Sequence, residues 1–319
     1  MGRRVAVIDD YQDVARRHAD WSALPAGSEL TVFTTPLGGT ADVAATLEPF
    51  DVVVAMRERT PFPAALFKQL PNLRLLVTTG MANASIAMDA ARAHGVTVCG
   101  THGSTAATPE LTWGLILDLA RNITAEHLRM REGGWQHTVG TDLAGSTLGL
   151  VGLGRIGTAM ARIASAFDMD VVAWSQNLDP ARAEAAGVRA VSKHELFTTA
   201  DFVSVHYKLS ERSVGVVGAH ELAQMKPTAY LVNTSRGPLV DQEALLEALR
   251  TGAIAGAGLD VYDVEPLPEH HPLRTASNVV LTPHLGYVTH RTYDVFYTEA
   301  VEDIAAFAAG TPVRVLNGV

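Results

Sequence analysis

Three charged residues in the C-terminal half of the chain could together act on a small carboxylic acid. Arg236, Glu265 and His284 each follow a short apolar run. An arginine binds a carboxylate through two parallel hydrogen bonds. A histidine transfers a proton near neutral pH, and a nearby carboxylate fixes its tautomer and favours its protonated form. With a nicotinamide as the hydride source, these three groups supply the parts needed to reduce a 2-keto acid.

A glycine-rich loop indicates where such a nicotinamide cofactor would bind. Gly152, Gly154 and Gly157 form a G-x-G-x-x-G pattern between an apolar run at 147–151 and a helical pattern at 156–167. In the dinucleotide fingerprint the first glycine permits the tight turn, the second lets the backbone approach the pyrophosphate, and the third allows close helix–strand packing. The helix N-terminus then offers free N–H groups to the phosphates. A ligand-free turn is the alternative, but three glycines at this spacing would weaken a helix start without any gain.

The next apolar run departs from that fingerprint. It ends at Ser175, where an acid that binds the ribose hydroxyls of NAD is expected. The chain reads Ser175-Gln176-Asn177, with neither an acid nor a base. Arg182 could reach back from the following helix, but Asp179 lies before it and would oppose a phosphate. We therefore expect NAD or NADP as cofactor, with weak discrimination between them.

The elements that must position these residues alternate along the whole chain. Continuous apolar runs are typical of strands covered on both faces, and their alternation with helical patterns predicts parallel sheets built from right-handed βαβ units. Because ligands bind at the carboxyl ends of such strands, Arg236, Glu265 and His284 share one sheet edge with the glycine loop. The predicted strands are 5–8, 30–34, 52–55, 73–78, 96–99, 148–152, 171–174, 202–206, 230–233, 257–261 and 279–282.

Several helices are also predicted, two of them long. One, at 108–122, is interpreted as a connector between domains, and a polar, glycine-rich interval follows at 132–145. A final helix at 292–309 places Val295, Ala300, Ile304 and Phe307 on one face. The shorter predicted helices are 89–94, 156–167, 182–186 and 242–250, the last with Asp241 before it and Gly252 after it.

Composition excludes several other classes of protein. The 319 residues are 47% hydrophobic and 18% charged, and 25 Lys and Arg against 34 Asp and Glu give a net charge of −9. A nucleic-acid binder needs a basic face, so this balance argues against one. With Cys99 as the single cysteine no internal disulfide forms, and we predict a cytoplasmic protein. The chain shows no metal-ligand spacing, no signal peptide and no membrane-spanning run, so neither a metal nor a membrane partner is expected.

Four motifs together resemble the D-isomer-specific 2-hydroxyacid dehydrogenase family. They lie at 152–157, 233–238, 260–266 and 283–286, and Thr79-Gly80, Glu110 and Met225-Lys-Pro227 extend the likeness through nearly the whole chain. The resemblance implies a Rossmann cofactor domain at 101–286. This domain is inserted in a discontinuous flavodoxin-like substrate domain at 1–100 and 287–319, with a cleft between the two. It also implies homodimers formed mainly through the cofactor domain.

The resemblance further implies a role for each matching residue. Arg236 would bind the carboxylate and carbonyl of the substrate, His284 would protonate the carbonyl oxygen, and Glu265 would hold His284. Asp260 would contact the nicotinamide carboxamide, and Arg155 and Ile156 would lie at the pyrophosphate. The remaining cofactor residues would be Gly152, Gly154, Gly157, Ser175, Tyr207, Thr234, Ser235 and Gly286, and the substrate loop would be Gly80, Met81, Ala82 and Asn83.

Two departures from the family pattern bear on the substrate. The family usually has Gly-x-Gly before an Asp-containing stretch where residues 80–85 read Gly-Met-Ala-Asn-Ala-Ser, and a small residue, Pro and Leu where Tyr207-Lys208-Leu209 stand. These differences leave the identity of the 2-keto or 2-hydroxy acid open. A corepressor-like protein that senses NAD(H) on the same fold is the alternative from another class. Oxidation of a small anion, with Arg57 or Arg59 as an extra cation, is a third possibility.

Overall fold

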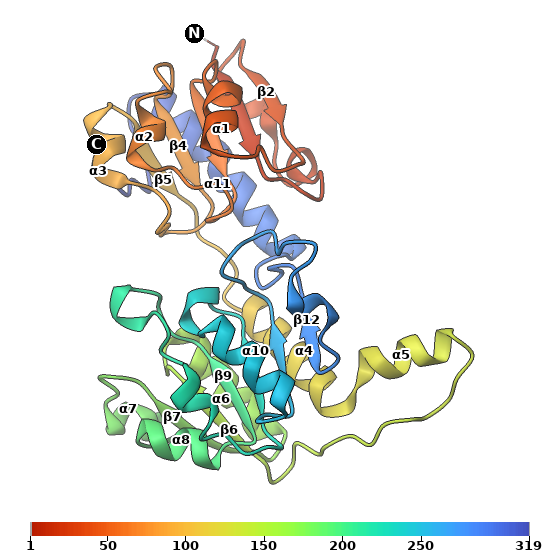
Figure 1. The fold of residues 1–319 in the computed structure, drawn as a ribbon. Helices are drawn as coiled ribbons and strands as arrows, with labels where there is room; N and C mark the ends of the chain where they lie inside the picture. Colours follow the sequence, from red (N-terminus) through yellow and green to blue (C-terminus); the bar gives the residue numbers. More distant parts are fainter. Residues whose placement is uncertain (1, 319) are drawn as a thin grey trace. The chain divides into compact units, whose positions relative to one another are not determined.

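The computed structural model describes residues 2–318 and divides into two compact units (Figure 1). The first unit comprises the chain up to Ser104 together with the chain from Val288 onward, and the second is Thr105–Tyr287. The sequence analysis predicts domain divisions after residues 100 and 286. Residues 1 and 319, where the predicted domain ranges begin and end, lie outside the described residues.

The first unit is built on a five-stranded parallel sheet. Its strands are β1 (Arg4–Ile8), β2 (Glu29–Val32), β3 (Val52–Ala55), β4 (Leu75–Thr78) and β5 (Thr97–Gly100). They lie in the order β2-β1-β3-β4-β5, which is the flavodoxin-like order. This order confirms the predicted fold class for this unit, and the apolar runs of β1, β3, β4 and β5 are buried as expected.

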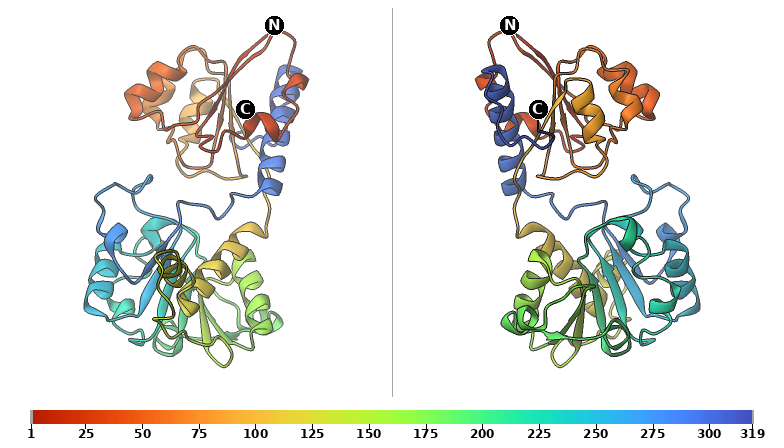
Figure 2. Two further views of the ribbon diagram at one scale, coloured as in Figure 1. Left: turned by 90° about the vertical axis from the view of Figure 1, so that its right-hand side faces the viewer. Right: turned by 90° about the vertical axis from the view of Figure 1, so that its left-hand side faces the viewer.

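Helices cover both faces of this sheet. Helices α1 (Thr40–Leu47), α2 (Ala64–Phe67) and α3 (Met88–Ala93) pack into one apolar core with β1, β3, β4 and β5. Figure 2 shows α11 (His290–Ala308) on the face opposite α1 and α2. A helix from the C-terminal part of the chain therefore covers one face of a sheet that is made by the first hundred residues.

The buried face of α11 differs from the predicted one. Ala300 and Ile304 are buried as expected, but Val295 and Phe307 are only half-buried. The main buried ridge consists of Tyr293, Phe296 and Tyr297. The predicted face did not include these three aromatic residues, whose rings are apolar over most of their surface and pack in the core.

The second unit contains a seven-stranded parallel sheet. Its strands are β6 (Thr147–Val151), β7 (Asp170–Trp174), β8 (Arg189–Ala190), β9 (Phe202–Val205), β10 (Tyr230–Asn233), β11 (Gly256–Leu259) and β12 (Val279–Leu281). The order is β12-β11-β10-β9-β6-β7-β8. Counted from β6, this is the 3-2-1-4-5-6 order of dinucleotide-binding folds with one more strand at the edge. The strand order reverses between β6 and β9, and this is where a ligand crevice is expected.

Three of the following helices of this unit were predicted from the sequence, at 156–167, 182–186 and 242–250, and two were not. These helices are α6 (Arg155–Ala166), α7 (Pro180–Ala185), α8 (Lys193–Thr199), α9 (Ala219–Leu222) and α10 (Gln242–Thr251). The Asp241 carboxylate accepts a hydrogen bond from the Ala244 N–H, and Gly252 ends α10 in the left-handed region, so both predicted caps are confirmed. Helix α4 (Ala107–Arg121), predicted as a connector, lies wholly within this unit and packs on β10, β11 and β12.

A projecting arm follows α4. Helix α5 (Ile123–Arg131) was not predicted, and it begins after Asn122, which adopts a left-handed conformation with φ of 53°. Figure 1 shows α5 and the irregular chain after it standing out from the sheet of the second unit. We call residues 123–142 the arm. Five of its large apolar side chains are exposed: Ile123, Leu128, Met130, Trp135 and Val139.

Candidate active site

The glycine loop between β6 and α6 is shaped by close backbone contacts. Gly152 has a φ of 102°, and a Cβ there would collide with the carbonyl of His206. A Cβ at Gly157 would collide with the carbonyl of Gly152. Gly154 is different, because a Cβ at this position would meet only open space. The open side of Gly154 and the first N–H groups of α6, at Arg155 and Ile156, therefore face a space that a phosphate could fill.

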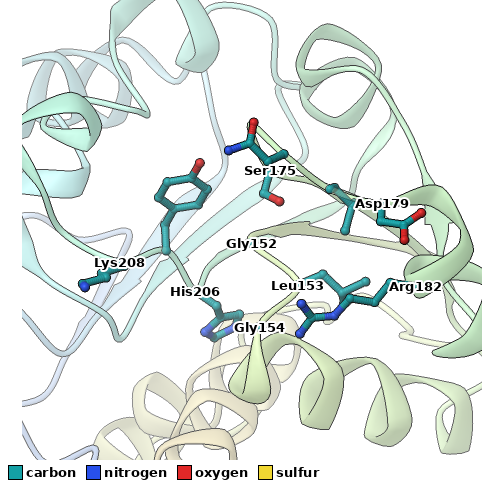
Figure 3. Close-up of a pocket in the computed structure, with 11 residues that line it drawn as sticks. Gly152, Leu153, Gly154, Ser175, Asp179, Arg182, His206 and Lys208 are labelled. Atoms are coloured by element: carbon teal, nitrogen blue, oxygen red, sulfur yellow. The ribbon is translucent and has the colours of Figure 1, made fainter.

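A pocket of about 440 Å³ lies against this loop (Figure 3). It is at the carboxyl ends of β6, β7 and β9, where the strand order reverses. The lining residues are Gly152, Leu153, Gly154, Ser175, Asn177, Leu178, Asp179, Arg182, His206, Tyr207 and Lys208. The cradle at Gly154 and the position of the pocket fit a nicotinamide dinucleotide.

The wall after β7 is held by Tyr207. Its ring stacks on Trp174, with the ring centroids 6.0 Å apart, and its hydroxyl accepts a hydrogen bond from the Gln176 N–H at 3.2 Å. Ser175 and Asn177 face the pocket from this wall. The pocket wall therefore has a hydroxyl at Ser175, where the dinucleotide fingerprint would place a carboxylate.

Sequence reasoning missed His206 and Lys208 as pocket residues. The Nε2 of His206 lies 2.8 Å from Ser204 Oγ, and its buried Nδ1 has no hydrogen-bond partner within residues 2–318. Burial lowers the pKa of His206 to about 3, so the imidazole is neutral at pH 7. A lone histidine after an apolar strand carries no signal for such a position. Lys208 stood out only as a departure from the family pattern.

The loop after β10 presents Arg236. The buried side chain of Asn233 fixes the turn, because it donates to the carbonyl of Arg236 at 2.9 Å and accepts from the Ser235 N–H at 3.0 Å. Ser235 Oγ donates to the carbonyl of Val205, and Thr234 Oγ1 lies 2.8 Å from Thr112 Oγ1 on α4. Arg236 is thus placed at the end of β10 by a network that runs to β9 and α4.

Glu265 and His284 are in direct contact. His284 Nδ1 lies 2.6 Å from Glu265 Oε2, and the Tyr262 N–H donates to the other carboxylate oxygen at 2.9 Å. The contact at Nδ1 leaves Nε2 as the atom of His284 that can give or take a proton. The imidazole side chain is 16% exposed and has a left-handed backbone, with φ of 55°. Side chains other than glycine adopt this conformation rarely, and functional sites are among the places where they do.

Asp260 holds the backbone around His284. Its fully buried carboxylate accepts hydrogen bonds from Thr282 Oγ1 at 2.6 Å, from the Leu285 N–H at 2.7 Å and from the Gly286 N–H at 2.8 Å. Burial raises the pKa of this carboxyl, and these hydrogen bonds act in the opposite direction. The structure shows Asp260 as the anchor of the turn that carries His284. Its contact with the nicotinamide stays a prediction.

The predicted substrate loop lies in the first unit, after β4. Gly80 has a φ of 105°, and its N–H donates to Thr101 Oγ1 at 3.1 Å. The Asn83 side chain donates to the Arg57 carbonyl and to Thr78 Oγ1 and accepts twice from Ser85, so it supports the loop itself. In the described part of the chain the N–H groups of Met81, Ala82 and Asn83 have no acceptor. Backbone amides, rather than the Asn83 side chain, are what this loop offers a ligand.

Most of the predicted site residues thus lie in the second unit, whereas the predicted substrate loop at 80–83 lies in the first. Asp260, Glu265 and His284 form one hydrogen-bonded group at the ends of β11 and β12. Across residues 2–318, no three His, Cys, Asp or Glu side chains gather as a metal site would require. Nor does any helix in that range have the length and apolarity to cross a membrane.

Comparison with known proteins gives a consistent match. Residues 113–286 fit the family model described as D-isomer specific 2-hydroxyacid dehydrogenase, NAD binding domain. A glyoxylate reductase of Korarchaeum cryptofilum is 37% identical over 265 residues, which are 81% of this chain and 80% of that protein. A hydroxypyruvate reductase of Blautia hydrogenotrophica is 30% identical over 325 residues, covering 98% of this chain and 99% of that one.

A solved structure agrees over nearly the full length. The crystal structure of a phosphoglycerate oxidoreductase from Vibrio cholerae superposes with a TM-score of 0.92 at 35% sequence identity. The match covers 97% of this chain and 99% of that one.

Proposed function

The chain belongs to the D-isomer-specific 2-hydroxyacid dehydrogenase family, and from this premise we propose that it interconverts a 2-keto acid and the D-2-hydroxy acid. The observation that carries the proposal is the 2.6 Å contact between Glu265 Oε2 and His284 Nδ1. It lies at the strand ends of the sheet that also bears the glycine loop and Arg236. A bound nicotinamide would supply or accept the hydride.

Each charged side chain has a distinct task in this proposal. The Arg236 guanidinium binds the substrate carboxylate through two hydrogen bonds and polarises the neighbouring carbonyl. His284 Nε2 gives a proton to the carbonyl oxygen during reduction and takes it back during oxidation. Glu265 stabilises the protonated imidazole through Nδ1. The free amides at 81–83 are proposed as further donors to the substrate.

The residues around the pocket would hold the cofactor. The first amides of α6, at Arg155 and Ile156, would bind the pyrophosphate, and Thr234, Ser235, Asp260 and Gly286 would line the nicotinamide side. We propose that both NAD and NADP are used, because the end of β7 carries no acid to repel a 2′-phosphate. A location in the cytoplasm also stays a prediction, which rests on the single cysteine.

The substrate is proposed to be a small 2-keto acid, since relatives are named glyoxylate and hydroxypyruvate reductases. The test is a panel of glyoxylate, hydroxypyruvate, pyruvate and longer 2-keto acids, each with NADH and NADPH. Cofactor oxidation is followed by absorbance, and the configuration of the product is determined. We expect reduction of at least one acid, with a D product where the product is chiral. A protein that binds NADH but reduces none of the acids would instead support the nucleotide-sensing alternative.

We also propose that the arm joins two copies of the chain. Helix α5 buries none of its own residues, and its apolar side chains are joined by Trp135 and Val139, which are 69% and 95% exposed. A monomer rarely leaves such a set in water. The arm carries Glu132 beside Arg129 and Arg131, so its charges can pair with those of a second arm around a two-fold axis.

A further inference from the structure

We propose that Arg182 binds the 2′-phosphate of NADP(H) and thereby allows this chain to use the phosphorylated cofactor. The inference rests on the proposed dehydrogenase function and names a specificity residue within its cofactor pocket. The sequence analysis set Arg182 aside, because Asp179 comes before it and would oppose a phosphate. The positions of these two side chains in the structure change that interpretation.

The first observation concerns Asp179. It is the N-cap of α7, and its Oδ1 accepts a hydrogen bond from the Ala181 N–H at 3.0 Å. Figure 3 shows its carboxylate directed away from the glycine loop. The negative charge is thus bound to the start of its own helix, where N-terminal N–H groups favour it. Its opposition to a 2′-phosphate in this pocket is correspondingly reduced.

The second observation concerns Arg182 itself. From α7 its side chain runs back toward Leu153 and Gly154, into the pocket (Figure 3). Throughout residues 2–318 its guanidinium makes no hydrogen bond or ion pair, so binding an anion would break no existing contact. Ser175, where the fingerprint places an acid, lines the same pocket and contributes a hydroxyl in its place. The ribose end of the cofactor thus meets a cation and a hydrogen-bond donor.

The net charge of the pocket lining favours binding of an additional anionic group, the 2′-phosphate. Arg182 and Lys208 are cationic, Asp179 is anionic and His206 is neutral, so the lining carries a net charge of about +1 in a chain of net charge −9. A phosphate monoester has a charge of about −1.5 to −2 at pH 7 and offers three strong acceptor oxygens. Arginine matches such a group through paired N–H donors.

The experiment measures binding and needs no turnover. Dissociation constants of NADH and NADPH are determined by quenching of protein fluorescence for the wild type and for Arg182→Met. The control is Arg162→Met, which removes the same charge from an exposed position on α6 outside the pocket. We expect Arg182→Met to weaken NADPH binding at least tenfold, which is 1.4 kcal/mol, and NADH binding less than threefold. Arg162→Met should change both constants less than threefold.

Two further measurements separate the possible outcomes. Displacement of NADH by 2′,5′-ADP and by 5′-AMP isolates the 2′-phosphate, and Ser175→Asp should shift preference toward NADH by adding the missing acid. Equal loss of NADH and NADPH binding in Arg182→Met would overturn the proposal and place Arg182 at the shared pyrophosphate. So would unchanged NADPH binding in that variant, or a wild type that binds NADH but rejects NADPH a thousandfold. A wild type that binds neither dinucleotide would contradict the proposed function itself.

Discussion

At the scale of single residues, we expect the contact between Glu265 and His284 to hold the imidazole in place for proton transfer. Glu265→Gln keeps the shape of the side chain but removes the charge 2.6 Å from Nδ1. The imidazole then loses its charged partner at Nδ1, so kcat/KM for reduction should fall about tenfold or more, the usual cost of losing a hydrogen bond to a charged group. The measurement is kcat/KM for the best keto acid, taken beside the Kd of NADH, which should change less than threefold. Equal activity of the variant and the wild type would show that Glu265 does not support His284.

Arg236 is tested by a substitution that keeps its charge. Arg236→Lys retains the cation but loses the planar pair of donors, and the ammonium cannot hold carboxylate and carbonyl together. We expect kcat/KM for keto acids to fall about 10²-fold or more, from the loss of a charge-assisted pair. The Kd of NADH should change less than threefold. Equal activity of the lysine variant on keto acids would exclude the carboxylate role.

The sequence shows some of these residues better than others. Arg236, Glu265 and His284 were found because each follows an apolar run that forms a strand, and parallel strands bring their carboxyl ends to one edge. The roles of Asn83 and Asp260 within their loops were not visible, because they depend on hydrogen bonds between turns that no spacing reveals. The direction of Arg182 likewise depends on how α7 begins at Pro180.

At the scale of elements, α11 is tied to the C-terminal segment through a buried acid. Asp303 is fully buried, and its Oδ1 accepts a hydrogen bond from Arg314 Nε at 3.1 Å. Burial raises the pKa of Asp303 to about 7, and Arg314 acts in the opposite direction. An acid with a raised pKa in the folded state stabilises the fold fully only while it is protonated. Its contribution is therefore lost as the pH rises from about 4 through 7.

Asp303→Asn removes this titration while keeping an oxygen that can accept from Arg314. The stability of the variant relative to the wild type should therefore rise between pH 5 and pH 8, as followed by urea unfolding. The control is Glu29→Gln, which removes an exposed carboxylate on β2, at the opposite edge of the sheet from Arg314, and should leave the pH slope unchanged. Parallel stability curves for Asp303→Asn and the wild type would contradict the expected titration.

The elements themselves were predicted unevenly, for physical reasons. Strand β10 and both caps of α10 match the prediction, because apolar runs and capping residues are local signals. Strand β8 has only two residues and leaves no pattern. Helix α5 was missed because it buries none of its own side chains, so the periodicity that marks a packed helix is absent.

At the scale of the whole molecule, the arm predicts the state of assembly. Trp135→Glu together with Leu128→Glu places charges where the proposed partner would bury apolar surface, which strongly disfavours association. We expect the wild type to sediment as a dimer and the double variant as a folded monomer, with circular dichroism as the check of folding. A wild type that sediments as a monomer at micromolar concentration would contradict the proposed assembly.

The parallel order of both sheets follows from the alternation of strands and helices along the chain, and it is confirmed throughout. That order brings the glycine loop, Arg236 and His284 to one edge of one sheet. Its central consequence is our proposal that His284 is the acid and base of the reaction.

The most direct test is the turnover of His284→Ala on the best 2-keto acid, measured beside the binding of NADH. Removal of a general acid lowers turnover by about 10²–10⁴-fold. We expect a loss of that size while the Kd of NADH changes less than threefold, because the pocket at the glycine loop does not include His284. Near-normal turnover by His284→Ala would contradict the account.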